Sequence, residues 1–149
     1  MDKKALNKEI NIELENLTRL VREMGDLTGR FVGEPDFIQT RAAGSILHDF
    51  YCGIEKIFER IAIRIDGGLP KGGDWHTELL LQMARSVMGI RESVISKGLM
   101  EKLKECLHFR HLFRHIYGFE LKWEQFKELA LSLNNLLTEL KNELERFSK

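Results

Sequence analysis

The chain has 149 residues, of which 43% are hydrophobic and 31% charged, and its 23 lysines and arginines balance its 23 aspartates and glutamates. This length is enough for one sizeable hydrophobic core, so we expect a single domain over residues 1–149. A net charge of zero excludes a general attraction to nucleic acid or to an anionic membrane, so a polyanionic partner would have to bind a local basic patch.

The amino terminus lacks the pattern of a secretory signal, and no apolar run approaches the about 18 to 20 residues that a membrane span requires. The two cysteines, Cys52 and Cys106, form no CxxC pair and fall on apolar stripes of expected helices. This pattern favours buried free thiols in a reducing compartment. We therefore predict a cytoplasmic protein with no membrane partner.

The first two expected helices follow from the spacing of apolar residues. A helix is predicted from about Lys4 to Met24, because apolar side chains recur every three or four positions, at Ile10, Leu14, Leu17, Val21 and Met24. Gly25 and the glycines that follow it are expected to end this helix. Asp36 can cap the second helix, with Gln39 as its capping-box partner. The wide apolar face of this second helix predicts a central position in a bundle.

A glycine-rich stretch, residues 66–74, separates the second helix from the third. Such a loop can cradle phosphate, but the GxGxxG and GK[ST] signatures are absent, so a flexible helix–helix connection is favoured. Asp74 is expected to cap the third helix, which should end at Gly89. Trp75 and His76 lie in its first turn and are expected to pack over the core or over a partner surface.

The fourth helix is expected after Gly98, with an apolar stripe that reaches Tyr117 and a stop at Gly118. The last helix is expected over about Lys122 to Phe147. No segment shows the alternation of period two that is typical of a strand. The sequence therefore predicts an all-α, up-and-down bundle of four to five helices.

Residues 110–117 carry the strongest functional signal. The segment reads Arg-His-Leu-Phe-Arg-His-Ile-Tyr and contains no acidic residue. The guanidinium of arginine fits phosphate oxygens, and histidine exchanges protons near neutral pH. RNA cleavage without a metal needs a base for the ribose 2′-hydroxyl, an acid for the 5′ oxygen and a cation on the phosphate, and histidine and arginine can supply all three.

Arg110 occupies a position on the apolar stripe of the fourth helix. A buried guanidinium without a partner is costly, so we expect either an ion pair, with Glu55 or Asp49, or exposure to a cleft or subunit interface. Arg110 and His115 lie about 140° apart around a regular helix, whereas Arg110 and Tyr117 align. For Arg110 and His115 to meet one phosphate, the Arg110 side chain must reach around the helix, the helix must loosen near its end, or two copies of the chain must face each other.

A metal site is a weaker reading of the same segment. His111 and His115 have the i, i+4 spacing of zinc ligands, but the glutamate of HExxH is missing and no third ligand is evident. We therefore predict no metal and no cofactor.

The RX4HXY motif is matched by Arg110, His115 and Tyr117, with four residues between the first two and one between the last two. The sequence around them, residues 109–121, resembles the HepT-type toxins of the HEPN superfamily. The order of the helices and the glycine-rich loop before Asp74 are also similar, so the resemblance covers nearly the whole chain. The resemblance implies an HEPN-like bundle and a metal-independent endoribonuclease that works as a homodimer with its cleft at the subunit interface.

The same resemblance implies the roles of individual residues and partners. Arg110 would stabilise the scissile phosphate of RNA and His115 would be the acid and base, with His111 and Arg114 as supporting substrate contacts. A cognate minimal nucleotidyltransferase antitoxin would silence the toxin, and Tyr117 matches the tyrosine that receives AMP. The alternative is a non-catalytic HEPN helical module that binds a nucleotidyltransferase partner or a nucleotide.

Overall fold

The computed structural model describes residues 3–149, and this part of the chain consists of helices joined by turns and loops. Its six α-helices are α1 (Lys3–Gly29), α2 (Phe37–Ile61), α3 (Trp75–Met83), α4 (Lys97–His115), α5 (Trp123–Leu131) and α6 (Leu133–Phe147). A π-helical segment, Ala62–Asp66, extends α2, and a short 3-10 turn, Gly118–Glu120, precedes α5. The prediction of an all-α bundle is confirmed.

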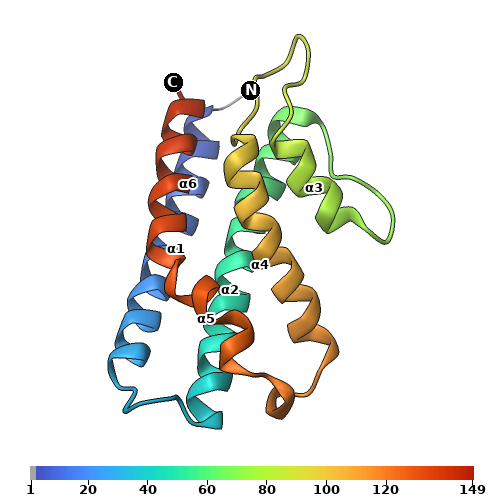
Figure 1. Ribbon diagram of the computed structural model, residues 1–149. Helices are drawn as coiled ribbons and strands as arrows, with labels where there is room; N and C mark the ends of the chain where they lie inside the picture. The colour runs from blue at the N-terminus through green and yellow to red at the C-terminus, as the bar shows by residue number, and fades with distance from the viewer. Residues whose placement is uncertain (1–2) are drawn as a thin grey trace.

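The long helices run alternately up and down, with α1 and α6 side by side and α2 behind α4 (Figure 1). Helix α2 packs against α1, α3, α4 and α5, which confirms its predicted central position. The short helix α3 lies at the end of the bundle that also holds the start of α1 and the end of α6 (Figure 1). The turn between α4 and α5 lies at the opposite end. Every α-helix contributes side chains to the buried hydrophobic cluster.

The start of α2 is fixed by the predicted capping box. The Gln39 backbone N–H donates to the Asp36 carboxylate at 2.8 Å, and the Asp36 backbone N–H donates to the Gln39 side chain at 3.0 Å. Two of the unpaired N–H groups at this helix end are thereby satisfied. Further along α2, a Cβ atom on Gly44 would lie 2.8 Å from Leu121 Cδ1 and 3.3 Å from Phe113 Cε1. The missing side chain allows α2 to approach the carboxyl-terminal half of α4 closely.

Two helix boundaries differ from the prediction for local reasons. Helix α1 continues through Gly25 to Gly29, because Leu27 extends the apolar stripe and packs on the core, which offsets the about 1 kcal/mol that a glycine costs in a helix. The predicted last helix is divided at Ser132, whose hydroxyl donates to the Leu129 carbonyl at 2.7 Å. A serine that bonds a nearby carbonyl competes with the helical ladder. This division gives six helices among residues 3–149, where the sequence predicts four to five.

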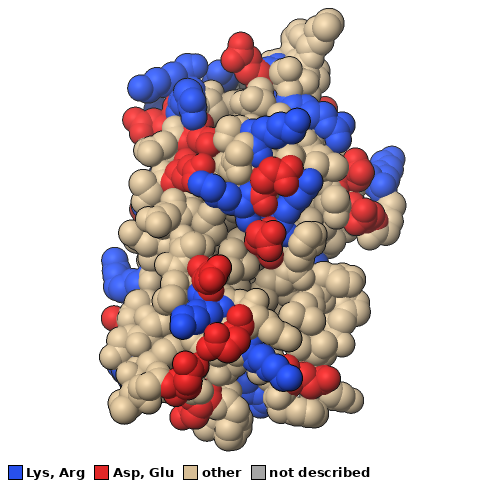
Figure 2. Space-filling model, in the orientation of Figure 1, with Lys and Arg blue, Asp and Glu red and all other residues tan. Residues whose placement is uncertain are grey.

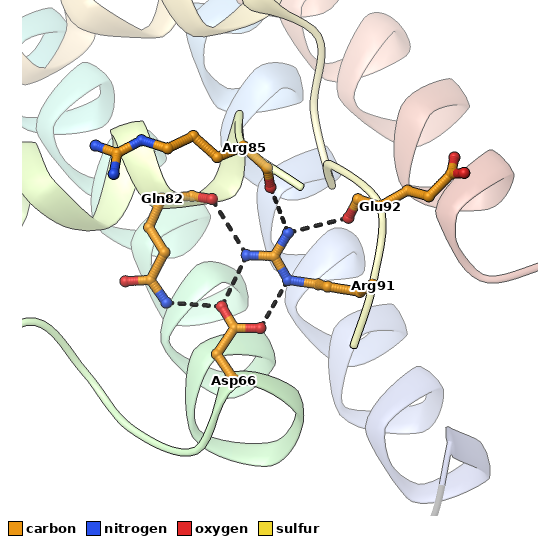
Figure 3. A network of polar contacts seen from close by, with 5 residues as sticks. All are labelled: Asp66, Gln82, Arg85, Arg91 and Glu92. Atoms are coloured by element: carbon orange, nitrogen blue, oxygen red, sulfur yellow. Dashed lines mark hydrogen bonds and ion pairs between the residues drawn. The ribbon is translucent and has the colours of Figure 1, made fainter. Parts of the chain in front are cut away.

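Helix α3 ends at Met83, not at Gly89, because a buried ion pair reorganises the chain that follows it. Arg91 donates to both carboxylate oxygens of Asp66 at 2.7 Å, and also to the backbone carbonyls of Gln82, Arg85 and Glu92 (Figure 3). The Gln82 side chain donates to the same carboxylate at 2.6 Å. Arg91 therefore satisfies carbonyl groups at the carboxyl end of α3 and ties α3 to the end of the α2 extension.

Candidate functional site

The basic segment of the sequence forms the last turns of α4 and the turn that follows. Helix α4 begins at Lys97, where Ser96 accepts a hydrogen bond from the Leu99 backbone N–H at 3.1 Å, and ends at His115. Gly98 therefore lies inside the first turn instead of before it. Ile116 and Tyr117 have extended backbones. The predicted alignment of Arg110 with Tyr117 along one helix face is wrong, because the helix ends two residues before the tyrosine.

His115 is exposed at the end of α4, and one of its ring nitrogens is engaged. Its Nδ1 lies 2.6 Å from the carbonyl oxygen of His111, and the two imidazole rings pack with their centroids 4.2 Å apart. A carbonyl oxygen can only accept a hydrogen bond, so Nδ1 must carry a proton. In the neutral ring, Nε2 then has the free lone pair. His115 is thus held as the tautomer that can take a proton through Nε2.

Arg110 lies on a different face of α4, and Glu55 of α2 is its acidic partner. Arg110 Nε is 3.5 Å from Glu55 Oε1, and the two side chains are 14% and 7% exposed. Glu55 is one of the two predicted partners; the other, Asp49, lies 3.7 Å from His48 instead. Nε of Arg110 is buried and has no hydrogen-bond partner among residues 3–149. The ion pair is therefore loose, although it is almost enclosed.

Glu55 also binds a second side chain, His76, that sequence reasoning did not connect with Arg110. His76 Nδ1 lies 2.8 Å from Glu55 Oε2, and the His76 ring stacks on Trp75 at 3.8 Å between centroids. Trp75 packs against the core, as expected. One buried carboxylate therefore joins α2, α3 and α4. No signal in the sequence indicated this role, because His76 is 21 residues from Glu55 and 34 from Arg110.

A further histidine, His48 of α2, lies beside the arginines of α4. Its ring stacks on Phe113 at 4.8 Å between centroids. Burial lowers the pKa of His48, and the charges of Arg110 and Arg114 lower it further, against an opposing effect of Asp49. Arg110 and Arg114 are four residues apart, so they share one face of the helix.

The environment of His48 predicts a measurable titration. We expect the pKa of His48 to lie below its ordinary value of 6.5 and to rise when Arg114 is replaced by alanine. Because folding lowers this pKa, His48 contributes stability that is present above pH 6.5 and is lost as the pH falls below that value. NMR titration of the imidazole would measure the shift, with Arg146→Ala as a control outside this cluster. An unchanged pKa of His48 in Arg114→Ala would contradict the effect of the Arg114 charge.

The two cysteines, Cys52 and Cys106, differ in how deeply they are buried. Cys106 is buried, as predicted, and burial raises the pKa of its thiol to about 12. Cys52 is only half-buried, and its sulfur lies 3.7 Å from His48 Nε2. Burial also raises the pKa of the Cys52 thiol, although the nearby charge of Arg110 opposes this effect. Neither thiol is therefore a ready nucleophile.

Tyr117, like His115, is exposed to solvent. Its side chain is 71% exposed, and its ring stacks on Phe119 at 5.2 Å, nearly parallel to it. Its backbone N–H donates to the Glu120 carboxylate at 2.8 Å, which fixes the turn. At Gly118 a Cβ atom would lie 2.4 Å from Arg41 Nε of α2, so the turn rests against the Arg41 guanidinium. The phenol is therefore held in a defined turn and open to solvent.

The predicted site residues fall into two groups. Helix α4 is regular through His115, so Arg110 and His115 remain about 140° apart around its axis. His111 lies with His115, and Arg114 lies with Arg110 and His48. The structure does not loosen the helix between the two motif residues. A single chain therefore presents the predicted cation and the predicted base on different faces.

A groove between α4, α5 and α6 lies apart from the motif residues. Its volume is about 720 Å³, and its lining includes Glu105, Glu124, Glu128 and Glu139 around an apolar floor. Figure 2 shows acidic side chains gathered around a hollow on this face. An acidic rim disfavours a polyanion. Among residues 3–149 there is neither a cluster of three or more side chains suited to bind a metal nor a helix long and apolar enough to cross a membrane.

Comparison with known proteins identifies the family. A family model described as HepT-like protein matches residues 42–149, which is about three quarters of the chain. Neither the curated proteins nor the solved structures gave a match. The matched region begins in α2 and includes Glu55, the basic segment of α4 and the turn with Tyr117. The chain therefore belongs to the family of HepT-like proteins.

Proposed function

We propose that this protein is a metal-independent endoribonuclease, the toxin of a toxin–antitoxin pair, and that it cleaves RNA in the cytoplasm as a homodimer. The HepT-like family is related to ribonucleases and to toxin–antitoxin components that dimerise. The observation that carries the proposal is the placement of Arg110 and His115 on different faces of a regular helix. Two copies related by a twofold axis can place Arg110 of one chain opposite His115 of the other.

The proposed mechanism assigns one role to each of these side chains. Nε2 of His115 removes the proton from a ribose 2′-hydroxyl, and the 2′ oxygen attacks the adjacent phosphorus. The bond from phosphorus to the 5′ oxygen breaks, and protonated His115 gives a proton to that oxygen, which restores the neutral ring. The products are a 2′,3′-cyclic phosphate and a 5′-hydroxyl. Arg110 offsets the negative charge that develops on the phosphate, with Arg114 and His111 as supporting contacts.

The proposed regulation involves Tyr117 and a minimal nucleotidyltransferase as cognate antitoxin. An exposed phenol in a fixed turn is accessible to an enzyme that transfers AMP. The added phosphate would place negative charge two residues from His115, where it would repel the RNA backbone. This part of the proposal is taken from the family resemblance and is supported by the exposure of Tyr117.

One observation favours a second function, a non-catalytic module that binds a nucleotidyltransferase or a nucleotide. Arg110 is almost enclosed and already paired with the buried Glu55, as in a structural ion pair. In this case, substitutions in the segment would weaken binding, and the wild-type protein would not cleave RNA. Incubation of purified wild-type protein with RNA in EDTA, followed by end-group analysis, separates the two functions. Cleavage that leaves 2′,3′-cyclic phosphate ends supports the ribonuclease.

Mixing subunits tests whether the site is shared between two chains. Arg110→Ala and His115→Ala proteins should each be inactive, but after subunit exchange half of the dimers would be mixed and would hold one intact site of two. We therefore expect recovery of about a quarter of wild-type activity. Recovery of no activity, with exchange confirmed by mass spectrometry of the intact dimers, would contradict a shared site.

The matched control is a mixture of wild type with the double variant Arg110→Ala/His115→Ala. If the site is shared, only dimers of two wild-type chains are active. The mixture then retains about a quarter of the activity of the same total amount of pure wild-type protein. A site contained within one chain would leave about half. The two mixtures together therefore distinguish the arrangements without a structure of the complex.

A further inference from the structure

Two arginines of this chain are paired with carboxylates in very different ways. Arg91 is held by Asp66 through two hydrogen bonds of 2.7 Å and also donates to three backbone carbonyls (Figure 3). Arg110 approaches Glu55 most closely through Nε, at 3.5 Å, and this Nε makes no hydrogen bond. The guanidinium of Arg91 is fixed by two short hydrogen bonds to one carboxylate, whereas the guanidinium of Arg110 has no such pair of bonds to Glu55.

The difference has a cause in the second partner of Glu55. A free carboxylate next to an arginine normally accepts two parallel hydrogen bonds from it. In Glu55, Oε2 accepts from His76 Nδ1 at 2.8 Å, and Oε1 is the oxygen that faces Arg110. The His76 ring is fixed in turn by its stacking on Trp75. His76 thus fixes the Glu55 carboxylate in an orientation in which it meets Arg110 through Oε1 at 3.5 Å rather than through a two-bond fork.

We propose that His76 and Glu55 are positioning residues for Arg110. Glu55 retains the guanidinium near the surface of α2 and α4, and His76 keeps that contact weak enough for the terminal nitrogens to bind a phosphate. Without His76, Glu55 turns both oxygens to Arg110, and the pair neutralises the cation that the substrate needs. This inference rests on the proposed ribonuclease function, because it assigns Arg110 a phosphate to bind.

The placement of His76 depends on the fold around it. His76 lies in the first turn of α3, and the Asp66–Gln82–Arg91 network anchors the other end of this helix to the α2 extension (Figure 3). With its side chain 24% exposed, His76 can be replaced without opening the core. A change of activity in a His76 variant can therefore be separated from a loss of folding.

The test compares His76→Ala with His76→Gln, because glutamine retains an N–H donor that can reach Glu55. Steady-state cleavage of a fluorogenic oligoribonucleotide gives kcat and KM separately. We expect His76→Ala to lower kcat roughly 10- to 100-fold, since a misplaced group at the reacting phosphate is costly, and His76→Gln to recover most of this loss. Glu78→Gln, an exposed change on the same helix, is the control and should retain wild-type kcat.

A second readout does not depend on activity. The NMR signal of the Arg110 Nε–H group, assigned with Arg110→Lys, should shift in His76→Ala and return toward its wild-type position in His76→Gln. If wild type fails to cleave RNA but this shift and its recovery are seen, the ribonuclease proposal fails and the positioning role stands. An unshifted signal overturns the positioning role, and so does a folded His76→Ala protein that cleaves RNA at the wild-type rate.

Discussion

Replacement of His115 by alanine is expected to abolish RNA cleavage while the protein remains folded. In the proposed mechanism, Nε2 of His115 is the base that activates the 2′-hydroxyl, and general acid–base catalysis contributes about 10²- to 10⁴-fold. The side chain is exposed, and its ring donates a hydrogen bond to a backbone carbonyl in the last turn of α4. Its removal therefore costs little packing, so the loss should fall on catalysis.

The measurement is cleavage of RNA in EDTA by wild type and variant at equal concentrations, with circular dichroism and thermal unfolding to confirm the fold. His108→Ala is the matched control, because His108 is an exposed histidine of the same helix that lines the acidic groove. Growth inhibition on expression should follow the same order, strong for wild type and His108→Ala and absent for His115→Ala. Wild-type cleavage rates in folded His115→Ala would refute the proposed role.

Replacement of Asp66 by alanine is expected to cause the largest loss of stability. The side chains of Asp66 and Arg91 are 6% and 3% exposed, so the substitution leaves a guanidinium buried without its carboxylate. Breaking a buried ion pair in this way typically costs about 3–5 kcal/mol. The carbonyls bonded to Arg91 do not compensate, because they carry only partial charge.

Urea unfolding monitored by circular dichroism would measure the change in the free energy of unfolding. The control is Glu78→Ala, which removes an exposed partner of Arg85 at 3.9 Å and should cost less than about 1 kcal/mol. Because the network also anchors α3, hydrogen exchange at residues 75–83 should be faster in Asp66→Ala. A loss of stability no larger than that of Glu78→Ala would show that the pair contributes little.

The features that sequence reasoning predicted are local ones. The capping box of Asp36 and Gln39 needs only four adjacent residues, and the stripe of the central helix repeats within one element. The motif around Arg110 is equally local, and its residue types and spacing are enough to indicate the family. Because Arg110 lies on the apolar stripe of its helix, an acidic partner was expected, either Glu55 or Asp49, and Glu55 is observed.

The features that were missed depend on contacts between distant parts of the chain. The end of α3 at Met83 follows from Arg91, whose carboxylate partner is 25 residues earlier. The role of His76 follows from its meeting with Glu55 across two helices. Helix α1 continues beyond Gly25, and the last helix is divided at Ser132. Differences in helix propensity at these positions are small, so tertiary packing determines where the helices end. Periodicity carries no information about such pairings.

The separation of Arg110 and His115 on a regular helix also has a consequence for how activity depends on the amount of protein. A site that needs one residue from each of two chains exists only in the dimer, so its abundance obeys mass action. Below the dissociation constant of the dimer, the number of sites rises with the square of the chain concentration, and a doubling of the protein gives up to about four times the nuclease. Small changes in synthesis would then decide between a harmless monomer and an active enzyme.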